Sequence, residues 1–341
     1  MKTTRFLAFA DFHYKKRMYP ETISDLNRIL DRGKSSDVGF ALQMGDFCND
    51  LSTSPEIAKA MLDNQQKLEI YGVYGNHELE GEGCSMPLVT KTLTNRPGTV
   101  KFGTADGTIG DGSIGHYCFE RDGFRFIALD TFYSLRPDGK WEHNVHLVPA
   151  AGNVRGQSLG DEQLAWLRAQ TLDAAKKELP VIVFSHSGFS GVWTSSPDAD
   201  AVRAIFREAN DIRKNTVILA LNGHYHTNHF AVVEDVAYFD VNAARFGYWQ
   251  EAEDKHYKDT DEYPFEDFDA AGNPLGKGTF PFNKTYGGLH GWFYTDPLSA
   301  IVTVKEDGSV SVEGSKTTWL YGIAPARPDD GMMPEISDFS K

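Results

Sequence analysis

Five apolar segments of this chain, each the length of a buried strand, are followed within two residues by aspartate, asparagine or histidine. The pattern occurs after Phe6–Ala10, Val38–Met44, Leu68–Tyr74, Val181–Phe184 and Thr216–Leu221. Strands that are apolar along their whole length are typical of parallel or mixed sheets covered on both faces. Because ligands bind at the carboxyl edge of such sheets, the pattern predicts one polar site assembled from distant parts of the sequence.

Helical patterns alternate with these strands. Amphipathic helices are predicted over Pro20–Leu30, from Ser54 onward, over Asp161–Ala175 and over Pro197–Ala209. Short antiparallel pairs are predicted for 115–119 with 124–129, for 230–233 with 236–241 and for 301–304 with 310–312. The alternation of buried strands and amphipathic helices indicates an α/β fold.

The 341 residues suffice for one large domain or two smaller ones, and the sequence contains neither an internal repeat nor a clean linker. We therefore expect a single domain over 1–325. Long stretches without periodicity predict loop insertions at about 79–113, 131–160 and 248–292. The polar tail 326–341 is expected to be loosely held.

Composition excludes several classes of partner. A hydrophobic content of 40% with 12% aromatic residues is typical of a globular protein. The net charge of −14 argues against binding nucleic-acid backbones and anionic membrane surfaces. A phosphate-bearing substrate stays compatible with this charge, because bound divalent cations reverse the local field.

Targeting and redox signals are weak. The apolar run Phe6–Ala10 is too short for a signal-peptide core, and no run is long enough to span a bilayer. We expect a cytoplasmic location, although a leader removed beforehand would leave no trace in this sequence. The three cysteines Cys48, Cys84 and Cys118 show no disulfide or zinc-knuckle spacing, which favours small buried thiols.

The polar residues at the strand ends form a set with the character of metal ligands. A single buried histidine is more often a satisfied core residue than a ligand. Carboxylates, an amide and imidazoles gathered along one sheet edge would however be costly to desolvate without cations. Mn, Fe or Zn accept such mixed oxygen and nitrogen donors, and the lack of a thiolate argues against a structural zinc site. The residues are Asp11, His13, Asp46, Asn76, His77, His186, His224 and His226.

Spacing within this set suits one or two metals. Asp11 and His13 are two residues apart, so in extended chain they point the same way. His224 and His226 repeat this spacing, which corresponds to roughly 6–7 Å along a strand. That separation is compatible with two neighbouring cations as well as with one.

These residues also lie in an ordered set of motifs. Asp11-x-His13, Gly45-Asp46, Gly75-Asn-His77-Glu78, His186 and Gly223-His-x-His226 follow one another between residue 6 and about residue 241. The set resembles that of the calcineurin-like metallophosphoesterases. The resemblance implies the metallo-dependent phosphatase fold, a four-layer α/β/β/α sandwich of two mixed β-sheets flanked by helices, which holds two divalent cations.

The resemblance also implies a role for each residue. One cation would be held by Asp11, His13, Asp46 and His226, and the other by Asp46, Asn76, His186 and His224, with Asp46 bridging. Two such cations would share a hydroxide that attacks phosphorus in line. His77 would contact the substrate and either stabilise the transition state or protonate the leaving oxygen. The identity of the two metals, Mn, Fe or Zn, is left open.

The insertion after residue 245 matches no motif and is expected to determine the substrate. Fifteen aromatic residues lie between Tyr238 and Tyr294, either as a stacking wall for a flat group or as the insertion's own small core. Arg245 is predicted either to bind a phosphate or to pair with a surface acid. Asn76, His77, Arg245 and Phe246 are the candidate substrate-binding residues.

The predicted function is metal-dependent hydrolysis of a phosphoester in a small molecule. A nucleotide diester, a nucleoside diphosphate conjugate and a phosphomonoester are all compatible substrates. Asp46 lacks the following arginine of Ser/Thr protein phosphatases, which argues against protein dephosphorylation. The first alternative is a non-catalytic scaffold of the same fold that binds a protein partner, and the second is a mononuclear hydrolase of amides or esters. The second alternative accounts for neither Asn76 nor the number of ligands.

Overall fold

The computed structural model describes residues 1–13, 22–48, 59–60, 63–64, 67–73, 75–79, 101–102, 115–143, 155–191, 196–251, 262–268, 274–279, 289–320 and 333–341. The helix predicted from Ser54 and most of the predicted 79–113 insertion lie outside these residues. Among the helices described, none is both long and apolar enough to cross a bilayer.

The first of two large sheets has six strands. Its members are β1 (Thr3–Phe9), β2 (Phe40–Met44), β3 (Glu69–Val73), β18 (Ala300–Lys305), β19 (Val310–Glu313) and β20 (Phe339–Ser340), in the order β20-β19-β18-β1-β2-β3. β1, β2 and β3 run parallel, whereas β18 pairs antiparallel with β1. The carboxyl ends of the three parallel strands therefore meet at one edge.

The second sheet has seven strands. They are β4 (Lys101–Phe102), β5 (Tyr117–Arg121), β6 (Phe124–Ala128), β10 (Val181–Phe184), β11 (Val217–Asn222), β12 (His229–Val233) and β13 (Val236–Asp240), in the order β12-β13-β11-β10-β6-β5-β4. β10 lies parallel to both β6 and β11, so their carboxyl ends again share an edge.

Residues of β1 explain why the central strands are apolar throughout. Phe6 and Ala8 point into the core shared by the two sheets, whereas Leu7 and Phe9 point to the opposite face. Because side chains alternate along a strand, burial of both faces requires a continuous apolar run.

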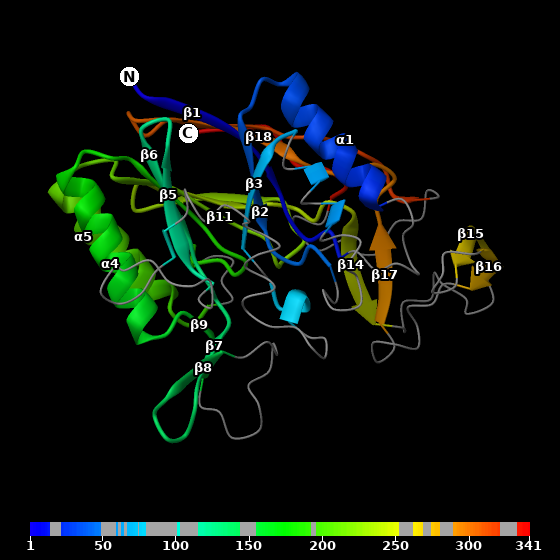
Figure 1. The fold of residues 1–341 in the computed structure, drawn as a ribbon, viewed down its shortest axis with the longest axis horizontal. Helices are drawn as coiled ribbons and strands as arrows, with labels where there is room; N and C mark the ends of the chain where they lie inside the picture. The colour runs from blue at the N-terminus through cyan, green and yellow to red at the C-terminus, as the bar shows by residue number, and fades with distance from the viewer. Residues whose placement is uncertain are drawn as a thin grey trace.

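Helices cover the outer face of each sheet (Figure 1). α1 (Thr22–Ser35) packs Leu26, Ile29 and Leu30 on the first sheet. α4 (Asp161–Lys176) and α5 (Ala199–Ile212) cover the second sheet with side chains that include Trp166 and Phe206. The predicted four-layer α/β/β/α sandwich is thus confirmed.

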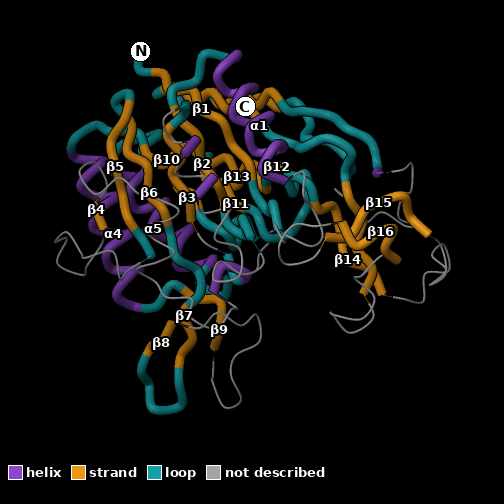
Figure 2. The backbone as a smooth tube through the Cα atoms, turned by 45° about the vertical axis from the view of Figure 1, so that its right-hand side comes forward, coloured by secondary structure: helices purple, strands orange, loops and turns teal. Residues whose placement is uncertain are grey.

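Smaller sheets occur where loops were predicted. β7 (Tyr133–Leu135), β8 (Trp141–His143) and β9 (Arg155–Ser158) form a three-stranded sheet. β14 (Phe246–Glu251) pairs with β17 (Leu289–Phe293), and β15 (Glu262–Phe268) pairs with β16 (Pro274–Thr279). Figures 1 and 2 show these units projecting from the sandwich, with the β7–β9 sheet apart from the other two pairs. Their strands are short or rich in polar and Gly residues, so they lack the apolar pattern of a core strand.

Within the predicted loose tail, the described residues 333–341 are held against the rest of the protein. β20 adds to the edge of the first sheet beside β19, and the side chain of Ile336 is buried in the core between the sheets. Ile336 is one of a few apolar residues in this polar stretch, and they do not alternate with polar residues as in a half-buried strand, which is why the sequence pattern missed it.

Candidate metal centre

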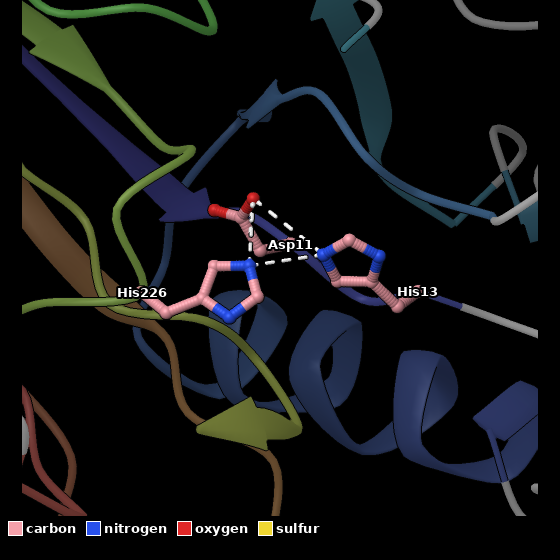
Figure 3. Close-up of side chains that lie close together, drawn as sticks. All are labelled: Asp11, His13 and His226. Atoms are coloured by element: carbon pink, nitrogen blue, oxygen red, sulfur yellow. Dashed lines mark hydrogen bonds and ion pairs between the residues drawn. The ribbon is translucent and has the colours of Figure 1, made fainter. Parts of the chain in front are cut away.

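Asp11, His13 and His226 form the first cluster of candidate ligands (Figure 3). His13 Nε2 lies 2.9 Å from His226 Nε2 and 3.9 Å from Asp11 Oδ1, and His226 Nε2 lies 3.4 Å from the same oxygen. All three side chains are buried. Asp11 and His13 follow β1, whereas His226 follows β11, so the cluster joins the two sheets.

A second cluster consists of Asp46, His186 and His224. Asp46 Oδ2 lies 3.2 Å from His186 Nε2, and His224 Nδ1 lies 3.1 Å from that same nitrogen. Asp46 Oδ2 also lies 3.7 Å from His13 Nε2, which places this carboxylate between the clusters. The arrangement is that of a carboxylate able to serve two adjacent cations.

A third possible ligand group consists of His13, Asp46 and His77. His77 Nε2 lies 4.0 Å from Asp46 Oδ2, and the His77 ring contacts the edge of the His13 ring with centroids 4.7 Å apart. The His77 side chain is 12% exposed, more than that of either neighbour. His77 is therefore the member of this group that a bound molecule reaches most easily.

Five of these residues have left-handed backbone conformations. The φ angles are 49° for Asp11, 50° for His13, 50° for Asp46, 73° for His224 and 53° for His226. Such angles are uncommon outside glycine, and Asn, Asp and His tolerate them best. The two-residue spacing therefore brings these side chains together through sharp turns after the strands, and not through extended chain as expected.

Glycines allow the ligand loops to approach one another. A Cβ on Gly75 would lie 2.7 Å from the Asp46 nitrogen and collide with Asp46 Oδ1. A Cβ on Gly223 would collide with Asp11 Oδ2 and lie 3.0 Å from the Met44 oxygen. The glycine of each motif is thus required by packing around the carboxylates.

Burial and neighbouring charges together set the protonation of the imidazoles. It lowers the pKa of His13 to about 3, against the opposing charge of Asp46. Burial and the neighbouring His186 also lower the pKa of His224 to about 3. Burial disfavours protonated His186, but the Asp46 carboxylate outweighs it and raises the pKa of His186 to about 9. Burial also opposes ionisation of Asp46, yet His186 holds the pKa of Asp46 well below its usual value.

His186 is oriented by the backbone of β2. Its Nδ1 lies 2.8 Å from the Met44 carbonyl oxygen, which can only accept a hydrogen bond, so Nδ1 carries the proton. In the neutral ring, Nε2 then presents its lone pair toward Asp46 and His224. Histidine ligands in metal sites are commonly oriented by such a bond.

Asn76 and Glu78 flank His77 in the turn after β3. Asn76 is 1% exposed, and the His77 N–H donates to Asp46 Oδ1 at 3.0 Å. Glu78 is fully buried, and its carboxylate accepts backbone N–H groups from Gly75 and from the loop after β2. Burial, followed by the charge of Asp46, raises the pKa of Glu78 to about 7. The sequence pattern assigned no role to Glu78, because no pattern in the chain indicates that backbone amides surround it.

Arg245 forms an ion pair with an acidic residue, as one of the two predictions for it proposed, but the acid is buried and not at the surface. Its Nε lies 3.4 Å from Asp25 Oδ2 of α1, and its guanidinium also donates to the Thr295 carbonyl. Both Arg245 and Asp25 are buried. The side chain of Phe246 lies outside the described part of the structure.

The donor set suits divalent cations. Imidazole nitrogens and carboxylate oxygens converge within 4.8 Å in each group, and most of them are buried. Nitrogen lone pairs and carboxylates at such distances repel one another unless protons or cations lie between them. This arrangement indicates a divalent metal centre.

Residues 4–228 match the model of the calcineurin-like phosphoesterase family. This is more than half of the chain, so the protein belongs to that family, and the resemblance seen in the motifs is confirmed. Membership supports metal-dependent hydrolysis of phosphoesters in general terms. A search of curated proteins finds no match to the sequence.

Solved structures match this chain at low sequence identity. A dimetal phosphatase from Danio rerio is 17% identical with a TM-score of 0.57, and the match covers 94% of this chain and 99% of that chain. GAP50 of Plasmodium, an anchor in the inner membrane complex, is 14% identical with a TM-score of 0.46, covering 92% and 84%. A phosphopantetheinyl hydrolase from Mycobacterium tuberculosis is 14% identical with a TM-score of 0.40, covering 71% and 90%. At these identities the first match supports the fold alone.

Proposed function

We propose that this protein hydrolyses a phosphoester bond in a small molecule with the aid of two divalent transition-metal ions, Mn, Fe or Zn. The observation that carries the proposal is the position of Asp46. Its Oδ2 faces His13 Nε2 at 3.7 Å on one side and His186 Nε2 at 3.2 Å on the other. A carboxylate shared between two ligand clusters is the arrangement that a two-metal site requires.

Each cation would take ligands from both sheets. Asp11, His13, Asp46 and His226 would hold one, and Asp46, Asn76, His186 and His224 would hold the other. When bound, such a pair lowers the pKa of water and polarises the phosphoryl oxygens. The chain's own contribution is to fix the ligand geometry in a largely buried site.

His77 is proposed as the catalytic residue that contacts the substrate. Its ring stands beside Asp46 and His13 and is partly exposed, so a phosphoryl group at the centre lies within its reach. From there the imidazole can donate a proton to the leaving oxygen or stabilise negative charge on the phosphoryl oxygens in the transition state.

We propose a small phosphorylated substrate, with neither nucleic acid nor a membrane surface as partner. The net charge of −14 is unfavourable for a polyanionic partner. A nucleotide diester, a nucleoside diphosphate conjugate and a phosphomonoester are the candidate classes. Arg245 is held by Asp25 and Thr295, so we assign it to positioning the segment after β13 and not to the substrate.

The test is a hydrolysis assay of the wild type and of His77→Ala with bis-aryl and mono-aryl phosphates in added manganese. We expect turnover by the wild type and a loss of about two to four orders of magnitude in kcat for the variant. We also expect the variant to retain its bound metal, measured by elemental analysis. A metal-depleted His77→Ala protein would place His77 among the ligands, and unchanged turnover would remove it from the mechanism.

A further inference from the structure

Glu78 is a buried carboxylate whose four hydrogen-bonding positions are all occupied by backbone amides. Its Oε2 accepts the N–H of Asp46 at 3.0 Å and that of Gly75 at 2.6 Å. Its Oε1 accepts the N–H of Phe47 and that of Cys48, the latter at 3.0 Å. Since a carboxylate offers about four lone-pair positions, Glu78 has none left for a metal ion.

The loop after β2 is shaped around this carboxylate. Gly45 and Asp46 have φ angles of 88° and 50°, and the three successive N–H groups of Asp46, Phe47 and Cys48 point toward Glu78. Successive amides in such a turn form a concave anion site. Here the anion is a side chain of the same protein, and without it three buried donors would lose their acceptor.

Two hydrogen bonds connect Asp46 to the turn that carries His77 and Glu78. Glu78 accepts the Asp46 N–H, and the Asp46 side chain in turn accepts the N–H of His77 at 3.0 Å. Asp46 Oδ1 is therefore hydrogen-bonded to the turn after β3. The other, Oδ2, is left facing His13 and His186.

We infer that Glu78 is a positioning residue, whose carboxylate clamps the loops after β2 and β3 so that Asp46 presents one oxygen to both metal positions. This inference rests on the two-metal site proposed above and goes beyond it by assigning a role to a residue that cannot itself be a ligand.

Glu78→Gln separates this role from a general role in folding. Glutamine has nearly the same shape, but its amide nitrogen cannot accept a hydrogen bond and it carries no charge. At least two of the four amides therefore lose their acceptor. Hydrogen-bonding partners of metal ligands typically contribute 10–100-fold to metal affinity.

The experiment measures Mn²⁺ binding to the full chain by calorimetry and the electron paramagnetic resonance of the Mn²⁺-loaded protein. For the wild type we expect two bound Mn²⁺ ions and the signal of an exchange-coupled pair. For Glu78→Gln we expect about 10–100-fold weaker Mn²⁺ binding and loss of the coupled signal. A folded variant with wild-type affinity and a coupled pair would overturn the inference.

A second variant covers the case in which Glu78→Gln does not fold. Glu78→Asp keeps the charge, but its shorter side chain cannot reach both loops at once. We expect weakened Mn²⁺ binding and a reduced coupled signal, and unchanged values for both would again contradict the inference.

Asp198→Asn is the matched control, because Asp198 is a buried carboxylate that accepts the Leu159 N–H at 2.7 Å outside the metal centre. We expect it to lower the melting temperature and leave Mn²⁺ binding unchanged. An equal loss of Mn²⁺ affinity in this control would show that the loss in Glu78→Gln comes from general destabilisation, and would overturn the inference. A wild type without paired Mn²⁺ would instead contradict the proposed function, so the two failures are distinguishable.

Discussion

His116 shows how burial without hydrogen bonds affects a single residue of this protein. The side chain is 5% exposed and packs against Trp166 with ring centroids 4.7 Å apart. Within the described residues, neither ring nitrogen has a hydrogen-bond partner. Burial lowers the pKa of His116 to about 4, only partly opposed by the charge of Asp130. The folded protein therefore keeps His116 neutral where an unfolded chain would protonate it.

The sign of the resulting pH dependence follows from linkage. Above the unfolded pKa of about 6.5, His116 is neutral in both states and has no effect on the free energy of unfolding. As the pH falls from 6.5 toward 4, only the unfolded chain gains the proton. Stability is then lost at up to about 1.4 kcal/mol per pH unit.

We predict that His116→Phe reduces this acid sensitivity. Between pH 7.5 and pH 5.5, the wild type should lose about 1 kcal/mol more stability than the variant. The measurement is urea unfolding of both proteins in the same chelating buffer, so that contributions of the metal-site histidines cancel. Equal losses in the two proteins would show that His116 is protonated in the folded state.

The left-handed ligands show what could not be predicted at the residue scale. That Asp11, His13 and Asp46 occur after apolar strands is visible in the sequence, because residue type and strand period are local properties. Their φ angles near 50° depend on bonds between loops, such as the His13 N–H to the Asp46 carbonyl at 2.9 Å. The partners in such bonds lie tens of residues apart in the sequence, so a local sequence pattern cannot predict them.

At the scale of the elements, the site depends on how closely the loop after β3 approaches the loop after β2. Gly75 lies at this crossing, with the Asp46 carboxylate against its Cα. A side chain at this position cannot be accommodated without displacing its neighbours, because these are backbone atoms and the Asp46 carboxylate, which is hydrogen-bonded to the His77 N–H.

We predict that Gly75→Ala displaces the Asp46 carboxylate and weakens metal binding by at least about tenfold. Loss of a residue that holds a metal ligand in place typically lowers metal affinity by this factor. The overall fold should persist, since the change lies at a sheet edge. The control is Gly39→Ala, where the added methyl group would meet only the end of the flexible Arg121 side chain. Calorimetric Mn²⁺ titration of both variants checks the prediction, and equal affinities would contradict it.

Elements of the sandwich were predictable to different degrees. β10 coincides with the predicted strand 181–184, whose four residues are all apolar and buried. The helix predicted over 161–175 is α4, although its buried face includes Gln163 and Thr171 besides Trp166 and Leu167. The three-stranded sheet of β7, β8 and β9 was predicted as loop. Its strands of three or four residues are too short to show an alternating pattern, so only their mutual pairing defines them.

At the scale of the whole molecule, the metal centre connects the two sheets. Asp11, His13 and Asp46 follow strands of the first sheet, whereas His186, His224 and His226 follow strands of the second. The sheets share one apolar core, so their carboxyl edges are brought together by the same packing that folds the chain. The site could be predicted as a set because all its members follow core strands. Glu78 could not, because its role depends on the loops between them.

We propose that this shared edge holds a pair of cations with Asp46 between them. The most direct test is the metal content of the purified full chain, determined by elemental mass spectrometry after saturation with Mn²⁺ and removal of free ions. We predict about two ions per chain, as in a two-metal site. One ion per chain, or none, would contradict it.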